Sequence, residues 1–424
     1  MLTLGNKKSK IYYGYVIVAS TFVIMVAMIG TVFTFGVFLT PMLTEFDWGR
    51  AVLSGAFSMS FLLSGFLGIL AGRLSDRFGP RSVVLVCSLF FGLGFVLMSQ
   101  VHAIWELYLF RGVIIAIGMS APVAPLQSTV VRWFVKRRGL MVAIFLMGPG
   151  VGSMIMPPIA NWLILLHGWR TAYIVLGAAS FLVIFLAALF LKRDPAQMDQ
   201  LPYGADEVEE HGVEPQYVNG LSLREAFHTV QFWLLCAFFF CIALVMMTIM
   251  THIVPHAIDV GISSTTAAII LAIIGGVSTA VMIPEGSMAD RIGVRRTTII
   301  LTALLAVSML WLLVTGQGMW SLFLFAVIFG LAFSSLDILL TLLSSSLFGL
   351  ISLGAIIGFV NSILQVGSAI GPFAAGLIFD STGNYHLAFL SCAAVAIIAL
   401  IITLLLRPIG PVDDNFEAKW SLKM

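Results

Sequence analysis

Twelve long apolar stretches occupy most of the chain and constrain its fold more than any other feature. They fall near residues 12–42, 52–72, 82–101, 104–131, 139–166, 170–191, 230–256, 266–289, 297–316, 319–348, 352–379 and 386–406. An α-helix needs about 20 predominantly apolar residues to cross a bilayer. Lipid provides no hydrogen-bond partner for an exposed peptide group, so stretches of this kind fold as helices. The sequence therefore predicts an all-α integral membrane protein with twelve transmembrane helices.

Composition excludes a soluble protein and several classes of function. Only 10% of the residues are charged and 60% are hydrophobic, whereas soluble domains carry about 25% charged residues. The net charge of +2 is too small to suggest a nucleic-acid partner. The four cysteines lie inside apolar stretches and match neither a disulfide framework nor a metal site. The sequence contains no phosphate-binding loop, dinucleotide fingerprint or protease motif, so we expect no enzyme, no cofactor and no metal.

The basic residues are concentrated in alternate connections between the stretches. Of the 22 Lys and Arg residues, 19 fall in every second connection and at the two termini. Such an excess marks the cytoplasmic side of a membrane protein, so both termini are predicted to be cytoplasmic. The first apolar stretch is too long to be the core of a signal peptide. We therefore expect a multi-pass protein of the cell membrane, which is the inner membrane in bacteria.

One connection, residues 192–228, is longer than the others and contains the acidic run DPAQMDQLPYGADEVEEHGVEP. This composition is typical of a solvated linker. It divides the chain into an N-terminal bundle at 1–191 and a C-terminal bundle at 229–406, each with six apolar stretches. Residues 407–424 would form a cytoplasmic tail.

A short motif follows the second apolar stretch of each half. Its members are Gly72, Asp76, Arg77, Gly79 and Arg81, repeated as Gly286, Asp290, Arg291, Gly293 and Arg295. Corresponding residues lie 214 positions apart, as do Pro158 and Pro372. One constant offset indicates an internal duplication and hence two pseudo-symmetric halves. Gly permits close helix approach, and Asp can cap a helix or pair with Arg of the other bundle, so we expect gating loops. Glu285 is expected to contact Arg81 or Arg295 there.

This organisation resembles the major facilitator superfamily over the whole chain. A narrower resemblance, to the prokaryotic oxalate/formate antiporter and monocarboxylate transporter branch, rests on both halves, with stretches such as FDWGRAVLSGAFS, RWFVKRRGLMVAI, HGWRTAYIVLG and HIVPHAIDVGIS. The resemblance implies a monomeric secondary transporter whose halves rock about a midplane site. Its cargo would be a small monocarboxylate such as lactate, pyruvate or formate. The coupled partner would be a proton or an exchanged anion.

The chain departs from this branch in the eighth apolar stretch. Members of the branch carry Gly-Arg there, whereas this chain carries Val281-Met282. Arg offers a planar fork to a carboxylate, and Met offers an apolar surface without a donor. Losing such a charge partner costs about 2–5 kcal/mol of binding. A second function therefore stays open, transport of a neutral or apolar small solute, including efflux by proton antiport. A third alternative is a sensor that kept the carrier fold without transporting.

Polar side chains inside apolar stretches are costly in lipid and therefore mark candidate site residues. Candidates for binding the solute are Gln127, His252, Met282, Asn361 and Gln365. Candidates for coupling are Arg111, His256 and Asp337. His252 and His256 share one helix face because they are four residues apart. Arg111 is expected either to pair with Glu106 or to face the central cavity.

Overall fold

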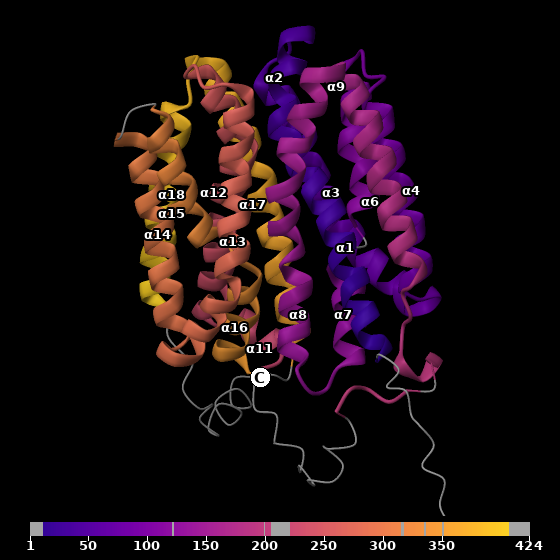
Figure 1. Cartoon of the computed structure of the whole chain (residues 1–424). Coiled ribbons are helices and arrows are strands. Elements are labelled where there is room, and N and C mark those ends of the chain that lie inside the picture. The colour runs from indigo at the N-terminus through magenta and orange to yellow at the C-terminus, as the bar shows by residue number, and fades with distance from the viewer. Residues whose placement is uncertain are drawn as a thin grey trace, which may run out of the picture.

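Helices make up almost all of the described chain (Figure 1). The structure is a computed structural model that describes residues 12–120, 123–198, 200–204, 221–314, 318–334, 336–349 and 352–406. The first half contains α1 (Tyr13–Phe33), α2 (Phe35–Phe46), α3 (Arg50–Phe78), α4 (Pro80–Met98), α5 (Ile104–Leu107), the π-helix η1 (Tyr108–Ile114), α6 (Ile115–Met119), α7 (Val123–Trp133), α8 (Arg138–Leu146) and α9 (Gly148–Leu189). Two short helices follow, η2 (Pro195–Met198) and α11 (Leu223–Phe227). The second half contains α12 (Val230–Asp259), α13 (Ser264–Ile292), α14 (Val294–Val314), α15 (Met319–Phe333), α16 (Leu336–Phe348), α17 (Leu353–Thr382) and α18 (His386–Leu405).

These helices account for the twelve predicted membrane crossings. Nine segments of the described chain are long and apolar enough to span a bilayer. One of them, residues 139–189, holds two crossings because Gly168 breaks α9 with φ 79° and ψ 162°. Two further crossings are built from shorter helices: α5, η1, α6 and α7 form one, and α15 and α16 form the other. The predicted all-α membrane fold with twelve transmembrane helices is confirmed.

The repeated motif has the same backbone geometry in both halves. Gly79 ends α3 with φ 84° and ψ 154°, and Gly293 ends α13 with φ 90° and ψ 147°. A positive φ is strained for residues with a side chain, which explains why Gly occupies this position twice. Pro80 follows Gly79 at the start of α4, where its missing N–H is no loss. The two copies of the motif therefore share the same sharp turn between consecutive helices, α3–α4 in the first half and α13–α14 in the second.

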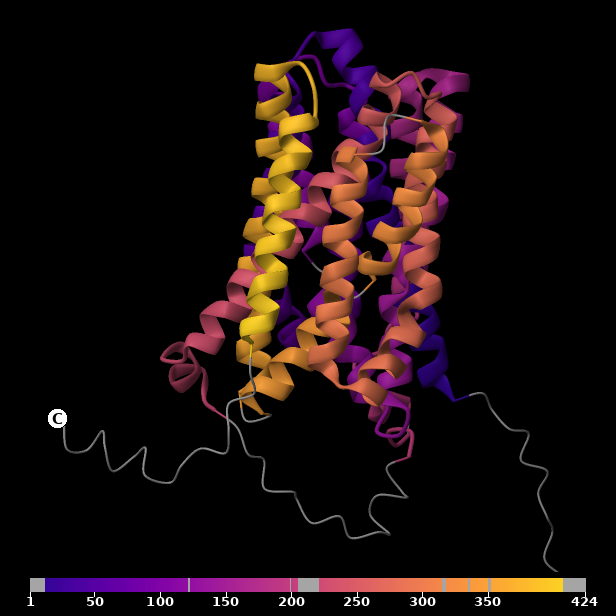
Figure 2. The ribbon, with the colours of Figure 1, turned by 90° about the vertical axis from the view of Figure 1, so that its left-hand side faces the viewer.

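The two halves stand side by side as helical bundles, with α1 to α9 on the right of Figure 1 and α12 to α18 on the left. Figure 2, turned by 90°, shows α18 (yellow) running along the height of the second half. Across the middle, α3 packs on α17, α9 on α13 and α2 on α12. The domain boundaries at 191, 228 and 406 stay predictions, and residues 205–220 and 407–424 lie outside the described chain.

The linker is anchored to both halves at one end of the bundle. The peptide N–H of Tyr203 donates to Trp133 O at 3.0 Å, and Val135 N donates back to Tyr203 O at 3.1 Å. In the second half, Leu221 N donates to Phe348 O at 2.8 Å. Backbone and side-chain hydrogen bonds from Ser222 at the start of α11 lower the pKa of the Glu225 carboxyl. We call this end of the molecule the linker end and the other the far end.

Candidate functional site

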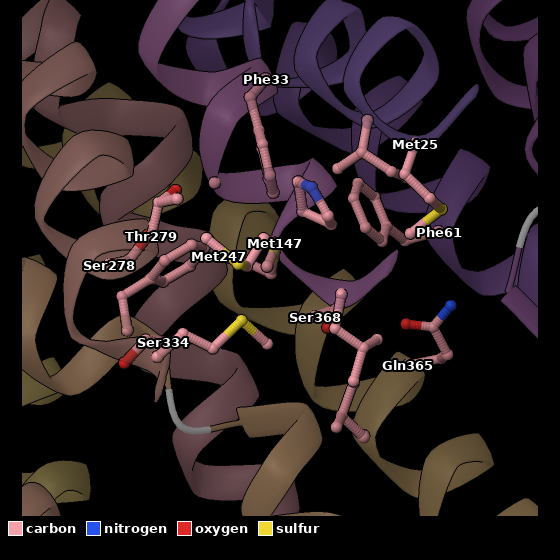
Figure 3. A pocket seen from close by; sticks show the side chains of 17 residues that line it. Met25, Phe33, Phe61, Met147, Met247, Ser278, Thr279, Ser334, Gln365 and Ser368 are labelled. Carbon is pink, nitrogen blue, oxygen red and sulfur yellow. The ribbon is translucent and has the colours of Figure 1, made fainter. Parts of the chain in front are cut away.

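A cavity of about 160 Å³ lies between the two halves (Figure 3). Helices of both halves line it: α1, α3, α8 and α9 from the first, and α12, α13, α15 and α17 from the second. Four methionines supply much of its wall, Met25, Met147, Met247 and Met282. Among the described residues that line this cavity, none carries a formal charge. The cavity therefore offers a soft apolar surface that adapts its shape to a small solute.

The polar atoms of the cavity differ in whether they are free to bind. The hydroxyls of Ser278 and Thr279 both donate to Gly275 O at 2.9 Å, so their protons are engaged within α13. The Ser368 hydroxyl is buried and has no hydrogen-bond partner. Gln365, three residues before it on α17, also lines the cavity. Ser368 and Gln365 are therefore the polar groups best placed to hold a solute.

The predicted solute-binding residues divide into two groups. Met282 is 5% exposed and lines the cavity, as does Gln365. Gln127, Asn361 and His252 do not line it; the first two are half-buried on α7 and α17. The structure therefore brings two of the five predicted residues together.

His252 faces the far end instead of the cavity. Its Nδ1 lies 2.8 Å from the Tyr385 hydroxyl, and its Nε2 lies 2.9 Å from Pro372 O and 3.3 Å from Ser54 Oγ. The prediction that this ring meets the solute is not supported by its position, because all of these partners belong to contacts among α3, α12 and α17–α18. The ring of its neighbour His256 stands edge-on to Phe389, with centroids 4.9 Å apart.

The far-end contacts form a network between the halves that the sequence did not reveal. Arg50, at the start of α3, reaches Asp259 at 2.8 Å and the Tyr385 hydroxyl at 2.6 Å. Its guanidinium also lies 3.6 Å from the centre of the Phe379 ring. Asp380 accepts hydrogen bonds from Arg50 N at 2.8 Å and Ala51 N at 2.9 Å, so a second-half carboxylate caps a first-half helix.

We call Arg50, His252, Asp259, Asp380 and Tyr385 the closing network. The available sequence signal was slight: Arg50 is one of only two basic residues in the connections predicted to be extracellular. Its partners lie 209 and more positions away along the chain, and spacing cannot identify them. The backbones also approach closely here, since a Cβ added to Gly376 would lie 2.8 Å from Ala51 Cα. The cavity is therefore shut at the far end.

Arg111 lies in the first half and is not among the residues that line the cavity, which it was expected to face if it did not pair with Glu106. It is 1% exposed, it sits in the π-helix η1, and its guanidinium stacks 4.8 Å from the centre of the Phe57 ring. Neither terminal nitrogen has a hydrogen-bond partner. Pairing with Glu106, one of the two expectations, is wrong, because that carboxylate accepts from His102 N at 2.7 Å and Ala103 N at 3.1 Å. A π-helix carrying an unpaired buried charge is typical of functional positions.

The first motif loop makes its contacts within its own half. Asp76 accepts from Arg132 at 3.3 Å, and its carbonyl oxygen accepts from Arg193 at 2.7 Å. The guanidinium of Arg77 lies 5.2 Å from the centre of the Phe78 ring. A Cβ added to Gly72 would meet nothing within 4 Å. The expected Asp–Arg pair across the two bundles is therefore not what Asp76 forms in this structure.

The second motif loop behaves in the same way. Arg295 donates to Leu404 O at 2.9 Å, and a Cβ added to Gly286 would meet nothing within 4 Å. Arg81 and Arg291 are exposed. Glu285 does not pair with Arg295 as expected; it is buried and accepts a hydrogen bond from Ser334. The side chains of Asp290 and Asp337 lie outside the described residues, so the coupling role of Asp337 stays a prediction.

Comparison with known proteins agrees with this architecture. The family model "Major Facilitator Superfamily" matches residues 21–286 and 240–422. Monocarboxylate transporter 13 of Rattus norvegicus is 26% identical over 90% of this chain and 86% of its own length. Monocarboxylate transporter 11 of Homo sapiens is 27% identical over 89% of this chain and 79% of its own.

Two solved structures share the fold. A D-xylose–proton symporter superposes with a TM-score of 0.73 at 14% identity, covering 93% of this chain and 98% of its own. A bacterial homologue of the human lysosomal transporter Spinster, inward-facing and unoccupied, gives a TM-score of 0.70 at 18% identity, covering 94% and 97%. The chain therefore belongs to the major facilitator superfamily, as a secondary transporter rather than an enzyme, and its sequence relatives include the monocarboxylate transporters.

Proposed function

We propose that the protein carries a short-chain monocarboxylate across the cell membrane, by proton symport or by exchange. The relatives named as monocarboxylate transporters match at least 89% of the chain, which supports this cargo class over the whole molecule. The observation that supports this proposal most is the cavity between the halves. Its volume of about 160 Å³ lies well below the 300–1,000 Å³ of pockets that hold drug-sized ligands. A solute of a few heavy atoms fits this space.

Transport would proceed by alternating access around this cavity. In the described part of the chain the closing network joins the halves at the far end, while the motif loops make contacts within each half at the linker end. The excess of Lys and Arg supports a cytoplasmic position for the linker end. With that orientation, the structure corresponds to a carrier closed towards the outside. Solute and coupled ion would exchange with the cytoplasm in this state.

The chemistry of the cavity favours carrying the acid together with a proton. A bare carboxylate needs a positive partner in a low-dielectric site, and the described lining residues offer none. A carboxylate and a proton entering together carry no net charge. The Ser368 hydroxyl and the Gln365 amide then suffice as hydrogen-bond partners, and the methionines accommodate a short alkyl tail. The resulting site would be weaker than one with an Arg at position 282.

A second candidate, a neutral small solute, is favoured by one specific observation. Met282 occupies the cavity wall at the position where the monocarboxylate branch carries its Arg. An uncharged solute with one or two hydrogen-bonding groups would lose nothing by this replacement.

Uptake into proteoliposomes distinguishes the two candidates. Radiolabelled lactate is supplied with and without an inward proton gradient to the native protein, to Met282→Arg and to Met282→Leu. Met282→Leu is the matched control, because it keeps the volume and the apolar character of the wall. Gradient-dependent uptake by the native protein and Met282→Leu is the expected result. Uptake by Met282→Arg alone would exclude the monocarboxylate and leave the neutral solute, to be sought among small uncharged compounds that raise the melting temperature of the native protein.

A further inference from the structure

Glu285 is a buried acid that the transport site, as described so far, does not use. It lies on α13 three residues beyond Met282, in the direction of the linker end, and it is 6% exposed. In this position it is enclosed by the bundle instead of reaching the basic residues of the motif loop. A carboxyl in the interior of a membrane bundle is costly and calls for a partner.

The partner of Glu285 also belongs to the cavity. The Ser334 hydroxyl donates a hydrogen bond to Glu285 Oε2, and Ser334 lines the cavity wall (Figure 3). The other carboxyl oxygen, Oε1, is buried and has no hydrogen-bond partner. Ser334 follows the last residue of α15, where the tenth membrane crossing is interrupted before α16. A hydroxyl can donate and accept at once, so Ser334 connects the carboxyl to whatever occupies the cavity.

The described surroundings of Glu285 hold no cation that could neutralise it. α13 packs against α9, α12, α14 and α15. α15 contains no titratable residue, and Arg295 and Arg296 at the start of α14 are exposed, with Arg295 donating to Leu404 O. On α12, His252, His256 and Asp259 belong to the far end, as do His167 and Arg170 near the break in α9. The side chains of Asp290 and Asp337 are outside the described residues.

This arrangement inverts the charge that the resemblance predicts for α13. The related branch carries an Arg at the position of Met282, whereas this chain carries an uncharged side chain there and an acid one helical turn further on. A site with a cation attracts the anion itself. A site with a buried, half-satisfied carboxyl instead takes up a positive charge, and a proton needs no further space.

We infer that Glu285 is the proton-binding group of this carrier and that Ser334 links its protonation to the occupancy of the cavity. The inference rests on the proposed proton-coupled transport and assigns that coupling to one residue. The proton adds to the carboxylate from water at the linker end while the cavity is open there. The neutral carboxyl no longer repels the carboxylate of the solute and passes a hydrogen bond to it through Ser334, so the site closes around the solute. The proton then leaves to water on the other side. No covalent bond other than O–H forms or breaks.

Infrared difference spectroscopy tests the proton site without knowledge of the cargo. The full-length protein in lipid nanodiscs is titrated, and the carbonyl band of protonated carboxyl groups is recorded for the native chain, Glu285→Gln, Ser334→Ala and Glu225→Gln. Glu225 is the matched control, because it is an exposed acid at the linker end. We expect one titrating band to vanish in Glu285→Gln only and to shift in Ser334→Ala. Identical spectra for the native chain and Glu285→Gln would overturn the inference.

Proteoliposome transport tests the coupling. Glu285→Gln keeps an acceptor for Ser334 and cannot ionise, so solute exchange without a proton gradient should continue within twofold of the native rate. Accumulation driven by a proton gradient should fall at least tenfold. Retained accumulation, or loss of both activities in a protein with native melting temperature, contradicts the assignment. If the native protein moves no lactate, the proposed cargo fails, whereas the infrared result still decides the role of Glu285.

Discussion

The two ends of the molecule differ in whether their charged residues bind across the two halves or within one half. At the far end, charged groups of one half bind the other half, as Arg50 does with Asp259 and Asp380. At the linker end, Asp76 and Arg295 bind partners in their own half. The repeated motif therefore makes no described contact across the halves, while residues outside the repeat hold them together. A contact between halves controls access only in the state in which it forms, so the network identifies which end is closed here.

The two ends also differ in how closely their helices pack. Close backbone approach at Gly376 leaves no space for a side chain, whereas Gly72 and Gly286 face open space. Where α3 meets α17, the far end is packed like a protein interior, in which small changes of volume are felt. At Gly72 and Gly286 of the linker end, a larger side chain would meet no neighbouring atom in this state. Substitutions should therefore shift the balance between the two states when they are made at the far end and leave it nearly unchanged at the linker end.

The largest effect is expected for Arg50→Ala. The substitution removes the ion pair with Asp259 and the bond to Tyr385, and it leaves a partly buried carboxylate without its partner. Truncating one member of such a pair costs about 2–5 kcal/mol. Because 34% of the Asp259 side chain is exposed, we expect the lower limit, about 2 kcal/mol or a thirtyfold shift towards the state open at the far end.

Distances between spin labels at the exposed residues Thr44 and Ser381 measure this shift, in a background with the cysteines replaced. Arg170→Ala is the matched control, since Arg170 is an arginine at the same end that binds Glu45 within its own half. An unchanged distance distribution in Arg50→Ala would mean that the closing network does not hold the far end shut.

A shift of similar size is expected for Gly376→Ala. The new methyl group would lie 2.8 Å from Ala51 Cα, so α3 and α17 would have to separate. Overpacking of this kind costs about 1–3 kcal/mol. Gly286→Ala, also on a helix but with nothing within 4 Å, is the control and should leave the label distances unchanged. Equal effects of the two substitutions would contradict the difference in packing between the ends.

Asp380→Ala should open the far end less than either change. It removes the cap of Arg50 N and Ala51 N, and the loss of a helix cap costs about 0.5–2 kcal/mol. Glu106→Ala removes a cap from α5 within the first half. We therefore expect both variants to lower the melting temperature, and only Asp380→Ala to change the distance between the labels. A shift in both would show that general destabilisation opens the far end.

The smallest effect is expected for Asp76→Asn at the linker end. The side chains of Asp76 and Arg132 are 70% and 35% exposed, and exposed ion pairs contribute about 0–1 kcal/mol. The label distances should stay within error of the native protein, and the melting temperature should change little. A shift larger than that of Asp380→Ala would mean that the first motif loop controls the present state after all.

Much of the architecture followed from the sequence because its causes are local. Lipid forces each apolar stretch to satisfy its own peptide groups, so length and composition predict a helix without knowledge of its neighbours. The turn at Gly79 and Gly293 is equally local, since the positive φ selects Gly in both copies. The position of Met282 in the central cavity could be expected too, because the resemblance to a known branch carries that position with it.

The sequence did not determine which way the polar side chains of these helices face. His252 was expected near the solute and instead binds Tyr385; Glu285 was expected at the motif loop and instead binds Ser334. Packing between helices decides how each helix is rotated about its axis. It also brings together residues that are distant in sequence, such as Arg50 and Asp380, which are 330 positions apart. Composition and span count are properties of each segment alone. The closing network, the uncharged cavity and the buried acid beside it arise only when the two halves are assembled.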